Sequence, residues 1–278
     1  MSGKPPRWEV LPSIIRQMLG DPLRWTDDEI AYLATLTPRE AERFIEQYDR
    51  DSRYPGLLGG DEDRKYTIIF AGGGAWYWAR LRADGTPGPG IPWRRIRFDI
   101  DNRLIRASMR RTGAMTERLI SGEMSLADWQ AAMAREVKYI NSVGAFLADG
   151  GPENLGVDAA SILREQLTSE LKYLDNFANQ LADGKAPLNR RSVNRAKMYS
   201  KAGRSTYERV RRNVAGRHNF DEERRYLGAA DHCDCCIIEA DRGWQPIGSL
   251  IPIGACTCGP NCQCIVVYRN SETGDVWE

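Results

Sequence analysis

The sequence predicts a mainly α protein, with a helical bundle as its body, a small β-hairpin before it and a cysteine-rich, zinc-knuckle-like module after it. Three observations predict this fold class. Apolar residues recur every three or four positions through the middle of the chain, two β-prone runs flank a glycine-rich segment, and all seven cysteines lie between Cys233 and Cys264. The 278 residues therefore divide into four segments, 1–60, 61–100, 101–226 and 227–278.

The composition narrows the class of protein. Hydrophobic residues make up 42% of the chain and charged residues 28%, which is typical of a folded globular protein. No run approaches the roughly 18 apolar residues of a membrane span, and the first residues lack the apolar core of a signal peptide, so we expect a cytoplasmic location without membrane contact. In a reducing compartment, clustered thiols favour a metal over disulfides.

The first segment, residues 1–60, is expected to form an acidic helical hairpin. Thr26 and Glu29 have the spacing of a capping box, and Thr37–Glu40 repeats the pattern with a proline at the first helical position. The expected helices span residues 27–36 and 38–49.

The second segment, residues 61–100, is expected to form a β-hairpin and a loop. Tyr66–Phe70 and Trp76–Leu81 are β-prone, and three consecutive glycines separate them. The glycines and prolines of Asp84–Gly90 predict a loop.

The third segment, residues 101–226, is expected to be the helical body. Ser125 is a helix N-cap candidate, and breaks at residues 150–152 and at Gly184–Pro187 separate the helices. Three apolar stripes at helical spacing are expected to form the core of an antiparallel bundle. Their members are Leu126, Trp129, Met133, Val137 and Ile140; Leu163, Leu167, Leu171, Leu174, Phe177 and Leu181; and Val193, Ala196, Tyr199, Ala202, Thr206, Tyr207 and Val210.

The last of these helices is strongly basic. Between Lys185 and Arg217 the only acidic residue is Glu208. Such a surface attracts phosphate backbones, so contact with nucleic acid is one hypothesis, and it would be nonspecific because the local tyrosines lie on the apolar stripe. The alternative is a solvated face, or one paired with acidic residues elsewhere, such as the N-terminal segment. The candidate contact residues are Arg190, Arg191, Lys197, Lys201, Arg204, Arg211 and Arg212.

The cysteines predict a structural zinc site. Zinc takes four ligands in a tetrahedron, usually as two closely spaced pairs, and Cys233-x-x-Cys236 is such a pair. Two of the three later residues Cys258, Cys262 and Cys264 are expected to complete the site. Cys235 and Cys256 are surplus in this interpretation, and His232 is a possible replacement for one thiolate. The alternatives are free or disulfide-linked thiols without metal, or a redox pair, although the strand and helix that flank such a pair are missing.

The sequence contains none of the common catalytic motifs. It has two histidines, and no nucleophile elbow, zinc-protease motif or P-loop. The glycines at 72–74 do not complete a dinucleotide fingerprint, because Tyr77 stands where the third glycine is needed. We therefore expect a protein that is not an enzyme.

Three stretches together resemble a known family. They are Leu227–Cys236, which ends in Asp-His-Cys-x-x-Cys; Gly243–Gly248, which reads Gly-Trp-x-Pro-Ile-Gly; and Cys258–Cys264, which reads Cys-x-x-Asn-Cys-x-Cys. This arrangement resembles the C-terminal cysteine motif of the minor head proteins of tailed phages and prophages, the Mu F-like or head-morphogenesis family. Weaker similarity in the helical segment extends the likeness over roughly residues 96–269. Relatives often carry His-Pro where this chain has Gly259-Pro260, and Cys258 is the candidate replacement for that histidine.

The resemblance implies a structural role in the virion. It implies a minor capsid protein of the phage head that associates with the portal protein, the major capsid protein or a scaffold protein, faces packaged DNA, and assists head assembly or DNA packaging. The alternative is a cytosolic zinc protein that binds nucleic acid nonspecifically.

Overall fold

The computed structural model describes residues 37–40, 66–70, 76–81, 84, 86–151, 154–228 and 231–277. The helical hairpin expected within residues 1–60 lies outside these ranges, except for Thr37–Glu40. Those four residues form the expected capping box. The backbone N–H of Thr37 donates to Glu40 Oε2 at 2.9 Å, and the backbone N–H of Glu40 donates to Thr37 Oγ1 at 3.4 Å.

A three-stranded antiparallel sheet precedes the bundle. Strands β1 (Tyr66–Phe70) and β2 (Trp76–Leu81) are the expected hairpin, and β3 (Pro87–Pro92) pairs with β2. The prediction of a loop over Asp84–Gly90 was therefore wrong for its second half. The order β1-β2-β3 leaves β3 at an edge, where a proline without an N–H costs no ladder hydrogen bond on the open side.

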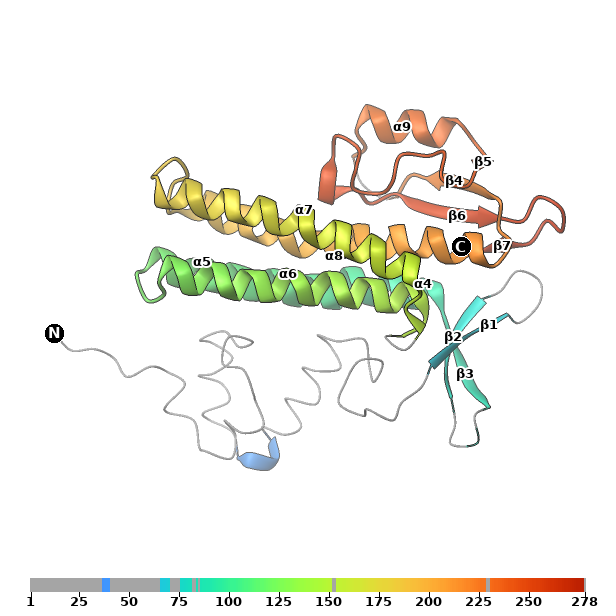
Figure 1. Ribbon diagram of the computed structural model, residues 1–278, viewed down its shortest axis with the longest axis horizontal. Coiled ribbons are helices and arrows are strands. Elements are labelled where there is room, and N and C mark those ends of the chain that lie inside the picture. Colours follow the sequence, from blue (N-terminus) through green and yellow to red (C-terminus); the bar gives the residue numbers. More distant parts are fainter. Residues whose placement is uncertain are drawn as a thin grey trace.

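The body is a bundle of four long helices, α5 to α8, which lie side by side in two layers (Figure 1). Helix α8 packs against each of the other three. A short helix and one π-helical turn lead into the bundle. The bounds are α4 Trp93–Asp99, η3 Ile100–Leu104, α5 Ile105–Ile120, α6 Leu126–Asp149, α7 Val157–Ala182 and α8 Arg190–Arg217.

The helix ends and stripes follow the sequence signals. Ser125 Oγ accepts from the backbone N–H of Asp128 at 3.1 Å, which confirms it as the N-cap of α6, and Gly150 ends that helix in the left-handed conformation. Asn189 caps α8 by accepting from the backbone N–H of Arg191 at 2.8 Å. The predicted stripes face the interior, with side chains such as Trp129 and Phe177 fully buried. The mainly α fold class is thus confirmed.

Helices α6 and α8 approach closely at a pair of glycines. A Cβ on Gly144 would lie 2.4 Å from the carbonyl oxygen of Gly203, and a Cβ on Gly203 would lie 2.9 Å from the carbonyl oxygen of Ile140. Real Cβ atoms do not approach backbone oxygens so closely, so the crossing needs glycine at both positions.

The C-terminal module is a four-stranded antiparallel sheet with one helix, in the order β5-β4-β6-β7. Strand β4 was not expected, because its sequence, Glu-Glu-Arg-Arg-Tyr, lacks the alternation of apolar and polar residues that marks a strand. Residues 222–226, which the sequence assigned to the helical body, therefore belong to this sheet. The bounds are β4 Glu222–Tyr226, α9 Asp234–Asp241, β5 Gln245–Pro246, η5 Gly259–Asn261, β6 Ile265–Arg269 and β7 Val276–Trp277.

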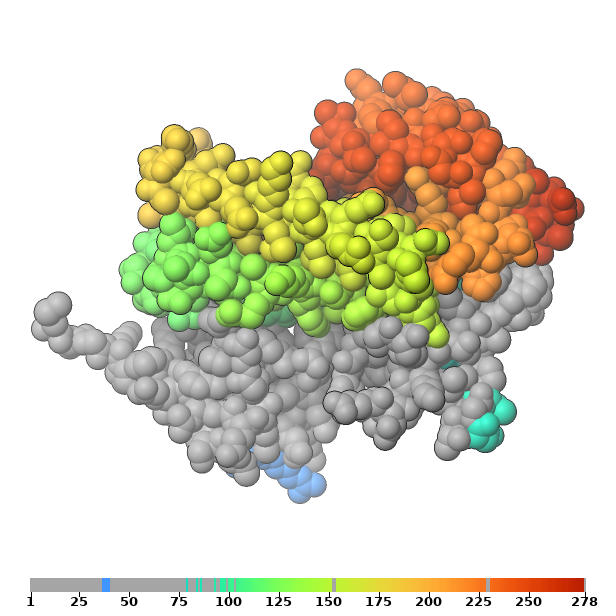
Figure 2. Space-filling view, in the orientation of Figure 1, coloured from blue at the N-terminus to red at the C-terminus, as the bar shows by residue number. Residues whose placement is uncertain are grey.

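The module shares a hydrophobic core with one half of the bundle. Tyr207, Val210 and Val214 of α8 belong to the same buried group as Tyr268 and Trp277 of the sheet. A second buried group around Trp129 and Phe177 fills the other half of the bundle. Figure 2 shows the module seated over only one half of the helices. Among the described helices, none combines the length and the apolar character that crossing a membrane requires.

Candidate metal centre

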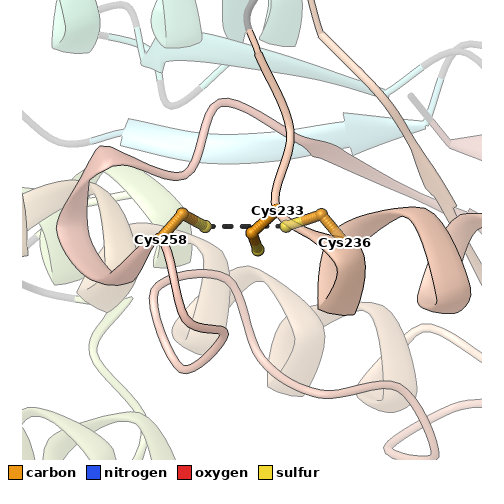
Figure 3. A group of neighbouring side chains, drawn as sticks. All are labelled: Cys233, Cys236 and Cys258. Atoms are coloured by element: carbon orange, nitrogen blue, oxygen red, sulfur yellow. Dashed lines mark hydrogen bonds between the residues drawn. The ribbon is translucent and has the colours of Figure 1, made fainter.

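The first two candidate ligands lie at the start of α9, so the expectation that no helix follows the Cys233-x-x-Cys236 pair was wrong. Cys233 is the N-cap residue of this helix in an extended conformation, and Cys236 lies in its first turn and is fully buried. The backbone N–H of Cys236 donates to the carbonyl oxygen of Cys233 at 2.9 Å. This turn brings the two side chains of the Cys-x-x-Cys pair close together, and Cys236 points toward Cys258 (Figure 3).

The other three candidates come from the loop around η5 and the residue before β6. Cys258 precedes this short 3-10 helix, Cys262 follows it, and Cys264 comes directly before β6. Helix α8 holds the loop in place. Lys201 Nζ donates to Asn261 Oδ1 at 2.6 Å, and Arg204 Nη2 donates to the carbonyl oxygen of Cys264 at 3.1 Å.

All five candidate cysteines meet around Cys236. Its sulfur lies 3.6 Å from that of Cys258 and 3.7 Å from that of Cys262. The sulfurs of Cys233, Cys236 and Cys258 lie within 4.8 Å of one another, and so do those of Cys236, Cys262 and Cys264. A Zn–S bond of about 2.3 Å places tetrahedral thiolates about 3.8 Å apart, so these spacings suit a thiolate-bound metal. The cysteine cluster is positioned to bind a metal ion.

The two cysteines that the sequence left surplus are joined to each other. Cys235 and Cys256 form a disulfide with their Cα atoms 5.8 Å apart, within the ordinary range of such bridges. Disulfides had been expected only as an alternative to a metal. The structure contains both a disulfide and a separate group of five thiols.

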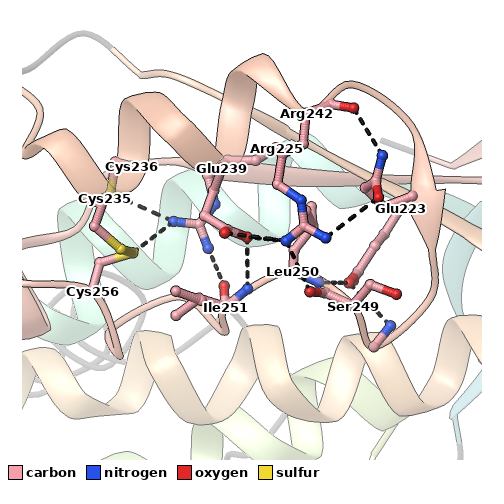
Figure 4. A network of polar contacts seen from close by, with 12 residues as sticks. Glu223, Arg225, Cys235, Cys236, Glu239, Arg242, Ser249, Leu250, Ile251 and Cys256 are labelled. Carbon is pink, nitrogen blue, oxygen red and sulfur yellow. Dashed lines mark hydrogen bonds and ion pairs between the residues drawn. A yellow bond between two sulfur atoms is a disulfide. The ribbon is translucent and has the colours of Figure 1, made fainter.

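A buried arginine connects the disulfide to the thiols. Arg225 on β4 is 1% exposed, and its Nη1 donates to Cys256 Sγ at 3.2 Å and to Cys236 Sγ at 3.5 Å. Its Nη2 donates to the carbonyl oxygen of Ile251 (Figure 4). The guanidinium therefore places a positive charge beside the sulfur cluster, where thiolates bound to a metal would concentrate negative charge.

Two buried glutamates order the loop below α9. Glu223 Oε1 accepts from the backbone N–H groups of Gly248 at 3.0 Å and Leu250 at 2.9 Å, and Glu239 Oε2 accepts from that of Ile251 at 2.8 Å. Figure 4 shows both carboxylates pointing into this loop. Burial raises the pKa of Glu223, although Arg212 and the two backbone donors oppose that shift. The Gly243–Gly248 stretch singled out in the sequence is thus part of the scaffold around the cysteines.

His232 lies beside the second triad and contacts Cys264 alone among its three sulfurs. Its Nδ1 lies 3.6 Å from Cys264 Sγ, and its Nε2 lies 2.7 Å from the carbonyl oxygen of Gly228. Because a carbonyl oxygen can only accept, Nε2 carries the proton and Nδ1 presents its lone pair toward the sulfurs. A histidine that ligates a metal usually donates its other ring N–H in this way.

Without a metal the thiols differ in acidity. Hydrogen bonding from the Cys236 backbone lowers the pKa of Cys233 to about 6, whereas burial raises the pKa of Cys264 to about 12. Burial also raises the pKa of Cys236 and of Cys258. Burial works to raise the pKa of Cys262 as well, but hydrogen bonds led by the Cys264 backbone outweigh it and the pKa is lowered.

Four of the seven basic residues proposed as nucleic-acid contacts are instead bound within the protein. Arg211 has no exposed side chain; its Nη1 donates to the carbonyl oxygen of Val266 at 2.9 Å. Arg212 pairs with Glu223 at 2.8 Å, and Lys201 and Arg204 hold the cysteine loop as described above. Their acidic partners are Glu223 of the C-terminal module for Arg212, Glu208 of α8 for Arg211 and Asp101 of η3 for Arg204, so none of these three lies in the N-terminal segment that had been expected to supply them. The remaining three are Arg190 and Arg191, which are exposed, and Lys197, which is half-buried.

No protein-family model, curated protein or solved structure matches the chain.

Proposed function

We propose that the chain is a minor capsid protein of the head of a tailed phage or prophage, with a structural and noncatalytic role. One observation carries the proposal. The three stretches on which the resemblance rests, which are separate in the sequence, come together in the C-terminal module. Cys233 and Cys236 meet the cysteines of the Asn261-Cys262-x-Cys264 stretch, Lys201 binds Asn261, and Glu223 binds the Gly243–Gly248 loop. Each part of the motif thus has a structural task in a single module, as expected of a motif that stabilises a fold.

We further propose that the metal is zinc and that its task is structural. The S···S distances of 3.6 and 3.7 Å around Cys236 are close to the edge of about 3.8 Å of a ZnS4 tetrahedron. Cysteine and histidine are the usual ligands of structural zinc. The module has a small sheet and long irregular loops, so a metal supplies stability that its own apolar contacts cannot.

The partners follow from the same proposal. The module covers only one half of the bundle, which leaves the far end of α7 and α8 available to a portal, major capsid or scaffold protein in the head (Figure 2). Arg190 and Arg191, exposed at the N-terminal end of α8, are the remaining candidates for contact with packaged DNA.

Mass spectrometry of gradient-purified tailed particles from the host of this chain tests the proposal. The chain is expected at low copy number in full heads, together with the portal protein. Its absence from purified particles, combined with salt-dependent DNA binding by the isolated protein, would favour the cytosolic nucleic-acid-binding alternative. The double variant Arg190→Glu/Arg191→Glu should then abolish DNA binding. The variant Arg110→Glu, at an exposed arginine of α5, should retain more DNA binding than the double variant.

A further inference from the structure

The short distances between the sulfur atoms group the five thiols as expected for two metal sites, not one. Among the described residues the close groups are triads, Cys233–Cys236–Cys258 and Cys236–Cys262–Cys264, and the two share only Cys236. In a mononuclear site with four thiolates, each sulfur lies close to the other three. Two triads joined at one sulfur correspond instead to two tetrahedra that share a corner.

We propose that this module binds two Zn²⁺ ions bridged by the thiolate of Cys236; the proposal rests on the zinc-stabilised module described above. One ion would be bound by Cys236, Cys262, Cys264 and His232, and the other by Cys233, Cys236 and Cys258 with a solvent molecule as its fourth ligand.

We assign His232 as the fourth ligand of the first site. Of the three sulfurs its ring lies close to that of Cys264 only, so the ring would move toward Cys236 and Cys262 when the metal binds. With a Zn–N bond of about 2.0 Å and a Zn–S bond of about 2.3 Å, a tetrahedral nitrogen and sulfur lie about 3.6 Å apart. The observed distance from His232 Nδ1 to Cys264 Sγ is 3.6 Å. The Nε2–H···O=C bond to Gly228 holds the ring in the tautomer that leaves Nδ1 free for the metal. This gives a closed site with three thiolates and one imidazole.

The second site has an open position. Cys233 and Cys258 are partly exposed, whereas Cys236, Cys262 and Cys264 are buried. Three thiolates leave one corner of a tetrahedron, and a corner next to partly exposed sulfurs is accessible to water. This ion should therefore exchange faster than the ion in the closed site.

The positive charge of Arg225 would offset the net negative charge of such a buried centre. Five thiolates and two Zn²⁺ together leave one negative charge, and a buried cluster with an unpaired charge is costly. The buried guanidinium of Arg225 supplies one positive charge, and it donates to the sulfur of Cys236, the thiolate proposed as the bridge. A single zinc with the same five thiolates would leave a threefold negative charge.

Metal titration of the full-length protein tests the proposal. Native mass spectrometry and elemental analysis of the wild type, loaded and then dialysed, should give two zinc ions per chain. With Co²⁺, the thiolate bridge should couple the two ions, so the electron paramagnetic resonance signal of the first equivalent should fall when the second is added. These measurements need no substitution and do not depend on how a variant folds.

Single substitutions assign the ions. Cys258→Ser should remove the open-site ion and leave one, and His232→Ala should weaken the closed-site ion by tenfold or more. The double variant Cys235→Ser/Cys256→Ser is the control and should keep both. One ion per chain at saturation, with an undiminished cobalt signal, overturns the two-metal centre but leaves the zinc-stabilised module standing. A protein that retains no metal overturns both.

Discussion

The thiols around Cys236 have unequal acidity, although they lie within a few ångströms of one another. Cys233 is partly exposed at the N-cap of α9, where backbone hydrogen bonding stabilises its thiolate, while the buried thiols Cys236 and Cys264 are less acidic. A thiolate is both the better nucleophile and the form that binds a metal. Cys233 is therefore the expected point of entry for a metal and for alkylating reagents.

Metal-free protein should react with iodoacetamide at Cys233 before Cys258 at pH 7, because only the former has a pKa near 6. The folded pKa is lowered from 9.0, so the thiolate is present at neutral pH and its reactivity falls as the pH drops through about 6. Peptide mapping after brief labelling measures the order. Zinc should suppress the reaction at Cys233, and equal labelling of both residues would contradict this assignment.

The sequence predicted which five cysteines form the cluster, but it did not predict the side chains that support them. Cysteine spacing is a local signal, so it could be read directly from the chain. Arg225 and Glu239 contribute through contacts made only after β4 and α9 pack together. Charged residues in a sequence are usually expected at the surface, so nothing local marked these two as buried.

At the scale of elements, α8 has two roles that the sequence could not separate. Its apolar stripe packs into the bundle, as predicted, and four of its basic residues bind the C-terminal module. Periodicity predicts which face of a helix is buried against its neighbours, but it cannot identify a charged side that is covered by a distant segment. Strands β3 and β4 were missed for a related reason. Each is held by backbone hydrogen bonds to a neighbouring strand, and glycine, proline and charged residues do not predict a strand from the sequence.

The crossing of α6 and α8 should tolerate no side chain at its centre. Gly203→Ala places a Cβ 2.7 Å from Ile140 Cγ1 and should lower the free energy of unfolding by about 1–3 kcal/mol, because the helices must move apart. Gly216→Ala on the same helix is the matched control: its Cβ would meet nothing within 4 Å, and the change should be neutral or raise stability by up to about 1 kcal/mol. Urea unfolding followed by circular dichroism compares the two. Equal effects would show that the close approach is unimportant.

At the scale of the whole molecule, the bundle and the C-terminal module are expected to unfold as one unit. They share a hydrophobic core, and the fully buried Arg211 of α8 binds strand β6 of the module. Its guanidinium lies 4.7 Å from the ring of Trp277 and 5.1 Å from that of Tyr268, and it pairs with buried Glu208 at 3.4 Å. Such a residue makes the stability of the module depend on α8, and that of α8 on the module.

Arg211→Ala should destabilise both parts together by on the order of 3 kcal/mol, because it leaves Glu208 with one fewer cationic partner in the interior. In protein loaded with Zn²⁺, helix content and zinc release, followed in the same denaturant titration, should shift by the same amount. Arg191→Ala, at an exposed arginine of the same helix, should change neither. If zinc release shifts alone, the module is an independent unit and the shared core does not couple it to the helices.

The disulfide lies beside the thiol cluster, so a metal bound by that cluster would close the segment between β4 and β6 into a ring for a second time. The Cys235–Cys256 bridge spans 21 residues and alone would remove unfolded-chain entropy worth about 3 kcal/mol. Reductants cut this bridge and spare thiolate–metal bonds, whereas acid and chelators do the reverse. A chain that holds both the disulfide and a metal would therefore keep its C-terminal fold closed in a reducing medium and in an oxidising one.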